Sequence, residues 1–126
     1  MTGKGIFEAD FLIFGTGFSI DLRHSKDLSP HAHLIALWSD KFKRTRKEDG
    51  ESNLLSYPYL GDGFQFLERL PGSAPWLKNV HLFSFGSTMS FGPSGSSINA
   101  MKFAVPRLVH AITRDLFLED IDHHFE

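Results

Sequence analysis

The sequence predicts an α/β fold, in which a partial sheet is joined to a long C-terminal helix. The run Phe-Leu-Ile-Phe at residues 11–14 is apolar without alternation, which is typical of a strand covered on both faces. A second apolar segment, residues 80–86, also ends in glycine and precedes a stretch with helical periodicity. A glycine at the end of each run predicts a place where the backbone can approach a ligand closely.

Length and composition indicate a single domain spanning residues 1–126. Apolar residues make up 41% of the chain and include 13 phenylalanines, enough for a core and too many for a disordered chain. A formal charge of −2 argues against a nucleic-acid-coating protein. No apolar run approaches the roughly 20 residues of a membrane helix. The absence of cysteine excludes disulfides and cysteine-ligated zinc, and it fits a cytoplasmic location.

Between the two glycine-ended runs, the sequence predicts short strands separated by turns. Apolar residues 34–38 and the partly alternating residues 64–67 are expected to be extended, and turn-forming residues cluster at 57–63 and 71–75. Residues 41–52 are the most polar stretch and are expected to form an exposed loop.

The last third of the chain predicts a helix over about residues 98–117. Pro106 lies inside it, so a kink or a restart is expected there, and the acidic tail 119–126 is expected to form a short helix or turn. Arg107, His110 and Arg114 fall on the polar side. The predicted core-facing stripe consists of apolar residues at helical spacing: Ile98, Met101, Val105, Leu108, Ile112 and Leu116.

The Gly/Ser-rich loop that leads into this helix is the strongest local pattern for binding. A helix N-terminus leaves backbone N–H groups unpaired and carries partial positive charge, so it attracts phosphate or an electron-rich carbonyl oxygen. Gly92 and Gly95 would allow a close approach of the backbone. The alternative is that Ser96 or Ser97 simply caps the helix, and the pattern alone leaves both readings open.

Other candidate motifs are incomplete. Gly15-Thr16-Gly17 does not continue into a G-x-G-x-x-G fingerprint, because Ile20 stands where the third glycine belongs and no long helix follows. The histidines lack the i, i+4 spacing of a helical metal site, and we predict no metal centre. No serine lies in a G-x-S-x-G elbow, so a hydrolytic triad is not predicted.

Two segments resemble the C-terminal part of flavin-dependent NAD(P)H oxidoreductases, especially flavin-containing and Baeyer–Villiger-type monooxygenases. Asp10, the apolar run 11–14 and Gly15-Thr16-Gly17 match the aspartate, strand and Ala-Thr-Gly with which that family returns to its FAD-binding domain. Glycine here replaces the usual alanine. The segment 79–86 and the following helix resemble the family's last strand and the helix that points at the flavin. Gly86-Ser87 stands where the glutathione-reductase branch has Gly-Asp, so a carboxylate contact to the flavin is not expected.

The resemblance implies a partial Rossmann-like, FAD/NAD(P)-binding-like sheet and a C-terminal fragment of the FAD domain of a larger oxidoreductase. The implied cofactor of the intact protein is FAD, reduced by hydride from NAD(P)H and reoxidised by oxygen or another acceptor. The implied partner is the missing N-terminal FAD/NAD(P)H-binding part, and the chain alone is expected to be inactive. The residues implied to lie near the cofactor, mainly through their backbone, are Gly15, Thr16, Gly17, Gly86, Ser87, Ser96, Ser97 and Ile98.

A rival interpretation is a small, non-catalytic binding module that shares these turns. A segment that belongs to a larger domain should expose apolar surface and tend to form a homodimer, whereas an independent module should be a stable monomer without affinity for flavin.

Overall fold

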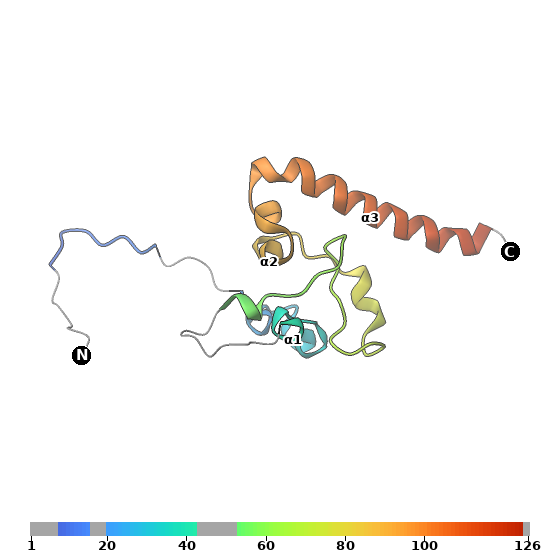
Figure 1. Cartoon of the computed structure of the whole chain (residues 1–126), viewed down its shortest axis with the longest axis horizontal. Coiled ribbons are helices and arrows are strands. Elements are labelled where there is room, and N and C mark those ends of the chain that lie inside the picture. The colour runs from blue at the N-terminus through green and yellow to red at the C-terminus, as the bar shows by residue number, and fades with distance from the viewer. Residues whose placement is uncertain (1–7, 16–19, 43–52, 125–126) are drawn as a thin grey trace.

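The computed structural model describes residues 8–15, 20–42 and 53–124, and this part of the chain is mostly helical (Figure 1). Its α-helices are α1 (Trp38–Lys41), α2 (Thr88–Phe91) and the long α3 (Ile98–His124). Short 3₁₀-helices connect them: η1 (Leu22–His24), η2 (Ser29–Leu34), η3 (Asn53–Ser56), η4 (Pro75–Asn79), η5 (Phe85–Ser87) and η6 (Gly92–Gly95).

The predicted α/β fold with a partial Rossmann-like sheet is wrong: the described residues contain no β-strand. The apolar segments approach one another only through isolated antiparallel bridges, such as Ile35 with Glu68 and Gln65 with His81. Backbone hydrogen bonds support these bridges, for example from Phe66 N to Val80 O at 2.9 Å. Within the described ranges these bridges do not extend into ladders, so the apolar runs form an irregular core and not a layered sheet.

Turn residues explain why the bridges stay isolated. Pro58 cannot donate a ladder hydrogen bond, and Gly61 and Gly63 bracket a turn three residues later. Phe64 then adopts a positive φ of 68°, a left-handed conformation that a strand does not contain. The expected strand at residues 64–67 is therefore interrupted at its first residue. The expected strand at 80–86 likewise turns into η5 at Phe85.

Two adjoining apolar groups form the core. One joins η1, η2 and η4 to the bridged segments, and its buried members are Leu22, Ala32, Ile35, Leu60, Phe66, Ala74 and Leu77. The other is aromatic: the fully buried ring of Phe64 lies 4.3 Å from Phe91 and 5.2 Å from Phe83, measured between ring centroids. Ser90 ties α2 to this core, because its hydroxyl lies 3.3 Å from both Trp38 Nε1 and Leu60 N, which donate to it.

Helix α3 is longer than predicted and packs through a different face. It continues without interruption through Pro106, where a kink or restart was expected, and includes the first residues of the acidic tail. Its contact face centres on two small residues, since Ala104 and Ala111 are buried, and Leu108 of the predicted stripe is half-buried between them. The predicted core-facing stripe is wrong in this respect: Ile98 is 86% exposed and Leu116 57%.

Polar residues of α3 face the rest of the chain. Arg107 lies over the Phe91 ring, with 5.3 Å from the guanidinium carbon to the ring centroid. Together with His110 and Arg114 it lines a cavity of about 470 Å³ beside the turn at residues 61–65. Arg107, His110 and Arg114 nevertheless stay exposed beside this cavity, and most of the large apolar side chains of α3 are exposed as well. None of the described helices is long and apolar enough to serve as a membrane span.

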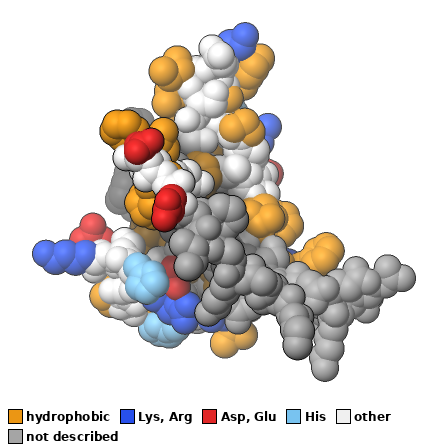
Figure 2. All heavy atoms as spheres, turned by 90° about the vertical axis from the view of Figure 1, so that its left-hand side faces the viewer, with side chains coloured by type: hydrophobic (Ala, Val, Ile, Leu, Met, Phe, Trp, Pro, Cys, Tyr) orange, Lys and Arg blue, Asp and Glu red, His pale blue; other side chains and the backbone are white. Residues whose placement is uncertain are grey.

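The segment 11–14 makes no regular secondary structure and stands apart from the rest of the described chain (Figure 1). Its four side chains are between 73% and 92% exposed. The prediction that this chain covers them on both faces is therefore wrong. Figure 2, viewed from the side on which this segment lies, shows hydrophobic side chains at the surface both in front and at the top of the molecule.

Candidate functional site

The structure brings the predicted Gly86-Ser87 junction against the loop that precedes α3. Ser84 begins η5, and its hydroxyl accepts a hydrogen bond from Gly86 N at 3.2 Å. Ser87 is fully buried and its Oγ donates to the Ser84 carbonyl at 2.8 Å. The hydroxyl predicted to lie beside a flavin is thus used, as a donor, to hold the turn together.

Gly95 fits this junction because it lacks a side chain. A Cβ at position 95 would lie 2.5 Å from Ser87 Oγ and 2.6 Å from the Ser84 carbonyl oxygen. The backbone of η6 therefore packs directly on the backbone of η5. Two of the predicted binding elements, residues 86–87 and the loop before α3, form one compact unit.

The loop ends where α3 begins. The Ser97 carbonyl accepts hydrogen bonds from Ala100 N and Met101 N, at 3.0 and 3.1 Å, which makes Ser97 the residue that precedes the helix. The N–H groups of Ile98 and Asn99 come before the first helical hydrogen bond, so they can donate to a ligand or solvent. Ser96, Ile98 and Asn99 are exposed. This N-terminus is therefore open to an incoming electron-rich oxygen.

A buried hydroxyl lies next to this helix start. Ser94 Oγ is inaccessible to solvent and has no hydrogen-bond partner among the described residues. It lies in a cavity of about 150 Å³ whose other walls come from Phe64, Phe91, Phe103, Ala104 and Arg107. An unpaired buried hydroxyl costs stability, so a polar group that reached it would be favoured.

The structure does not bring the first predicted glycine to this unit. Gly15 is exposed, and nothing in the described chain lies within 4 Å of where its Cβ would be. Thr16 and Gly17 lie outside the described residues, as do residues 43–52 of the predicted polar loop. Ile20 does reach the junction: its Cγ2 lies 3.6 Å from the position of a Cβ on Gly86.

A second cavity, of about 340 Å³, was not predicted from the sequence. Its charged walls come from Asp21, Arg23 and Arg69, and His33 and Ser56 also line it. The Asp-Leu-Arg sequence at its edge could have indicated the pairing of Asp21 with Arg23, since an aspartate that caps a helix can bond an arginine two residues later. Arg69 comes from a distant part of the chain, and nothing in the local sequence indicates that it joins them.

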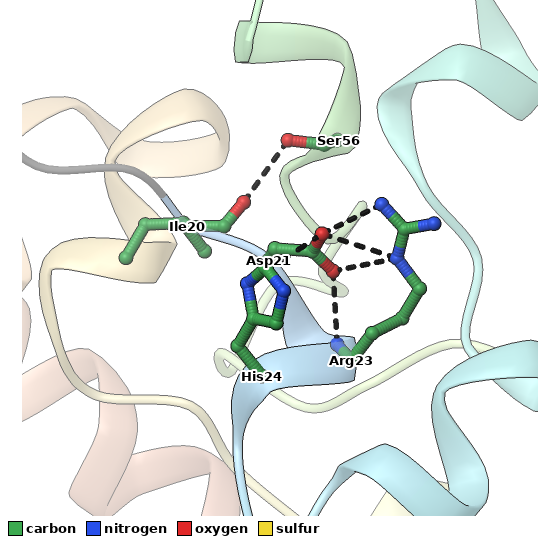
Figure 3. Close-up of polar contacts among 5 residues, drawn as sticks. All are labelled: Ile20, Asp21, Arg23, His24 and Ser56. Carbon is green, nitrogen blue, oxygen red and sulfur yellow. Dashed lines mark hydrogen bonds and ion pairs between the residues drawn. The ribbon is translucent and has the colours of Figure 1, made fainter.

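The arginines of this cavity are already paired. Asp21 caps η1 and accepts hydrogen bonds from Arg23 Nη2 at 2.6 Å and from Arg23 Nε at 2.9 Å (Figure 3). These bonds, together with one from the Arg23 backbone, lower the pKa of Asp21 to about 2. Arg69 Nε donates to Asp40 at 3.0 Å. The positive charge that would attract an anion is largely offset, so we assign this cavity no catalytic role.

Two of the histidines in the described ranges have structural contacts. His81 Nδ1 lies 2.7 Å from the Gly63 carbonyl, and the His31 ring stacks edge-on against Trp76 at 5.0 Å. No group of three or more metal-ligating side chains occurs in the part of the chain that was searched, namely its described residues.

Comparison with known proteins finds sequence similarity to a flavin-dependent enzyme. The chain is 33% identical over 121 residues to an FAD-dependent urate hydroxylase of Xanthomonas campestris pv. campestris. The match covers 94% of this chain but 25% of that protein, so the chain spans about a quarter of the length of the curated relative it matches. No protein-family model and no solved structure matches the chain. The similarity supports a segment like that of a flavin-dependent oxidoreductase.

Proposed function

We propose that this chain is the C-terminal FAD-domain segment of a flavin-dependent oxidoreductase and supplies one wall of the cofactor site. The observation that carries the proposal is the similarity of nearly the whole chain to part of an FAD-dependent enzyme. NAD(P)H is the proposed co-substrate of the intact protein, and the cytoplasm its proposed location. The proposed partner is the remaining FAD/NAD(P)H-binding part. When bound, FAD would supply hydride acceptance from NAD(P)H and electron transfer to an acceptor.

The residues at the start of α3 fit such a cofactor as one wall of its site. The exposed N–H groups at Ile98 and Asn99 would donate to the electron-rich O2 side of a flavin, and the helix dipole would favour the reduced, anionic form. Ser96 and Ser97 would set the direction of the helix. Gly86 and Ser87 would support the loop from behind, because Ser87 is buried beneath Gly95. Gly15, Thr16 and Gly17 would lie near the junction with the nucleotide-binding part.

The chain cannot hold the cofactor by itself on this proposal. It lacks the G-x-G-x-x-G fingerprint that grips a pyrophosphate, and the α3 N-terminus offers only a few donors. The purified 126-residue chain is expected to be colourless and inactive. A yellow preparation that oxidises NADPH would show that the chain is a complete enzyme and that the proposal is wrong in that respect.

A chimera tests the contact between α3 and the flavin. In it, this chain replaces the matched residues of the Xanthomonas enzyme, and FAD affinity is measured for two isosteric variants. Asn99→Asp adds a negative charge in the first turn of α3, which should stabilise the helix but weaken FAD binding by about tenfold through repulsion. Asn79→Asp adds the same charge at the end of η4 and should leave FAD affinity unchanged. Equal affinities in both variants would argue against the proposed contact.

The second candidate is a small, non-catalytic binding module. The observation in its favour is the amount of large apolar surface that the described chain leaves exposed, notably on α3 and residues 11–14. Gel filtration separates the candidates. A stable monomer with no affinity for FAD, also in the chimera, would favour the module.

A further inference from the structure

A small cavity beside the first turns of α3 brings a buried hydroxyl and an arginine together. It measures about 150 Å³ and is lined by Phe64, Phe91, Ser94, Phe103, Ala104 and Arg107. Ser94 Oγ is inaccessible to solvent and has no hydrogen-bond partner among the described residues. A buried hydroxyl of this kind is rare in folded proteins, because it has lost its hydrogen bonds to water without a replacement. A polar group in the cavity would restore one.

Among the described residues that line this cavity, Arg107 alone is charged. Its guanidinium carbon lies 5.3 Å from the centroid of the Phe91 ring, and it makes no ion pair with any described residue. Stacking on a ring leaves the N–H donors in the guanidinium plane available. Asp62 lines the neighbouring larger cavity together with Arg107, but the two are not paired. Unlike the paired arginines of the cavity of about 340 Å³, Arg107 therefore offers an anion an uncompensated positive charge.

The remaining walls are mainly aromatic. The Phe64 ring is fully buried and lies 4.3 Å from Phe91, measured between ring centroids, whereas Phe103 is 71% exposed. Phe64 thus forms the inner side of the cavity, and the exposed Phe103 and Arg107 form its outer side. An apolar cavity of about 150 Å³ is large enough to hold a benzene ring. Aromatic rings also attract one another in offset or edge-on arrangements, so these walls favour a planar ring.

We propose that this cavity binds a small aromatic carboxylate. The ring packs among the phenylalanines, and the carboxylate accepts hydrogen bonds from Arg107, which is the geometry in which an arginine binds most strongly. Ser94 donates to the same carboxylate after a change of rotamer. A purely apolar ligand would leave both polar groups unpaired, and an inorganic anion would leave the rings uncovered. The site goes beyond the proposed flavin contact and does not depend on it, since all of its walls belong to this chain.

Benzoate binding to the purified 126-residue chain tests the site. Benzoate carries both the ring and the charge, whereas acetate lacks the ring and benzyl alcohol lacks the charge. Equilibrium dialysis should show saturable binding of one benzoate per chain, with both analogues bound at least about tenfold more weakly. Benzoate that binds without saturation, or no more tightly than either analogue, would overturn the proposal.

Two arginine variants separate this cavity from a general attraction of anions. Arg107→Gln should weaken benzoate binding by at least about tenfold, because it removes the charge that pairs with the carboxylate. Arg114→Gln removes the same charge two turns later, outside the cavity, and should leave the affinity unchanged. Arg114 is already paired with Asp115 at 2.9 Å. Equal losses in both variants would contradict the proposed site.

Ser94→Ala should affect binding and stability in different directions. It removes a hydroxyl that has no partner in the described part of the ligand-free chain, so the midpoint of thermal unfolding should not fall. It also removes a donor to the carboxylate, so benzoate should bind about three- to tenfold more weakly. Ser73→Ala, which changes an exposed serine outside the cavity, is the control and should leave the affinity unchanged. An unchanged benzoate affinity in Ser94→Ala would contradict the proposed contact, whatever its effect on stability.

Discussion

Gly63 and Ala111 lie in direct contact, and this contact seats α3 on the turn at residues 61–65. A methyl group on Gly63 would overlap the Cβ of Ala111. Both positions are buried. The close approach of helix and turn therefore depends on the absence of a side chain at position 63.

The first prediction concerns this seat. Gly63→Ala should destabilise the chain by about 1–3 kcal/mol, because the added methyl forces the helix and turn apart. The measurement is urea denaturation followed by circular dichroism. Gly15→Ala is the control, since nothing in the described chain lies within 4 Å of its added methyl. A loss of stability that is the same in both variants would exclude the steric explanation.

The second prediction concerns the packing of η6 on η5. Gly95→Ala should cost more stability than Gly92→Ala, because its methyl would meet the Ser84 carbonyl oxygen at 2.6 Å. Gly92 has open space around it, but its φ of 66° and ψ of −157° lie in a region that is essentially restricted to glycine, so alanine there carries only a conformational cost of about 1–3 kcal/mol. Thermal unfolding of both variants gives the comparison. The reverse order would show that the junction is loosely packed.

The helix at the C-terminus was predictable from the sequence, and the direction in which it faces was not. Apolar spacing and good helix-forming residues predicted the position at which α3 begins to within a few residues. The stripe was assigned to the core because large apolar side chains usually face it. Ala104 and Ala111 gave no such signal, since alanine contributes little to an amphipathic pattern. The contact with Gly63 joins residues far apart in the sequence, and no local pattern encodes it.

The failure of the predicted sheet has a different cause. The apolar runs at residues 34–38, 64–67 and 80–86 lie in or beside the core but are not strands, because periodicity alone cannot tell a strand from an irregular segment of the same length. Turn residues between the runs are so closely spaced that each pairing ends after one bridge. At the candidate site, the glycine and serine pattern predicted a close approach of the backbone to a ligand at Gly95, whereas the close contact in the structure is with η5 of the same chain. It did not indicate that the Ser87 hydroxyl would be used within the turn.

The third prediction concerns acid titration at η1. Hydrogen bonds from Arg23 lower the pKa of Asp21 from 3.8 to about 2. The folded state therefore binds this proton less readily than the unfolded state. The stabilising contribution is complete above pH 3.8 and is lost as the pH falls through about 2.

Substitution of the arginine tests the cause of this shift. Arg23→Gln should return the pKa of Asp21 towards 3.8, because the side-chain hydrogen bonds from Arg23 are the largest contribution. Lys26→Gln removes the same charge three residues later and should leave the pKa of Asp21 low. NMR titration of the Asp21 carboxyl carbon measures both. An unchanged pKa in Arg23→Gln would contradict the pairing drawn in Figure 3.

The fourth prediction concerns self-association of the isolated chain. With its apolar surfaces uncovered, the chain should form concentration-dependent oligomers and bind a hydrophobic dye. Phe14→Asp should reduce both, because it places a charge within the exposed segment. Phe42→Asp is the matched control, since Phe42 is 63% exposed and lies at the end of α1. Light scattering across a concentration series checks the outcome, and an equal response of the two variants would refute the role of residues 11–14.

The shallow seating of α3 also has a consequence for how long the chain survives in a cell. A helix held mainly by two alanines and one glycine contact opens at little cost, and local opening is where proteolysis begins. The isolated chain thus displays both an easily opened helix and the apolar side chains that chaperones and proteases bind. On the proposed function, the remaining flavin-binding part would cover both. Abundance would then follow assembly, with unassembled copies removed soon after synthesis.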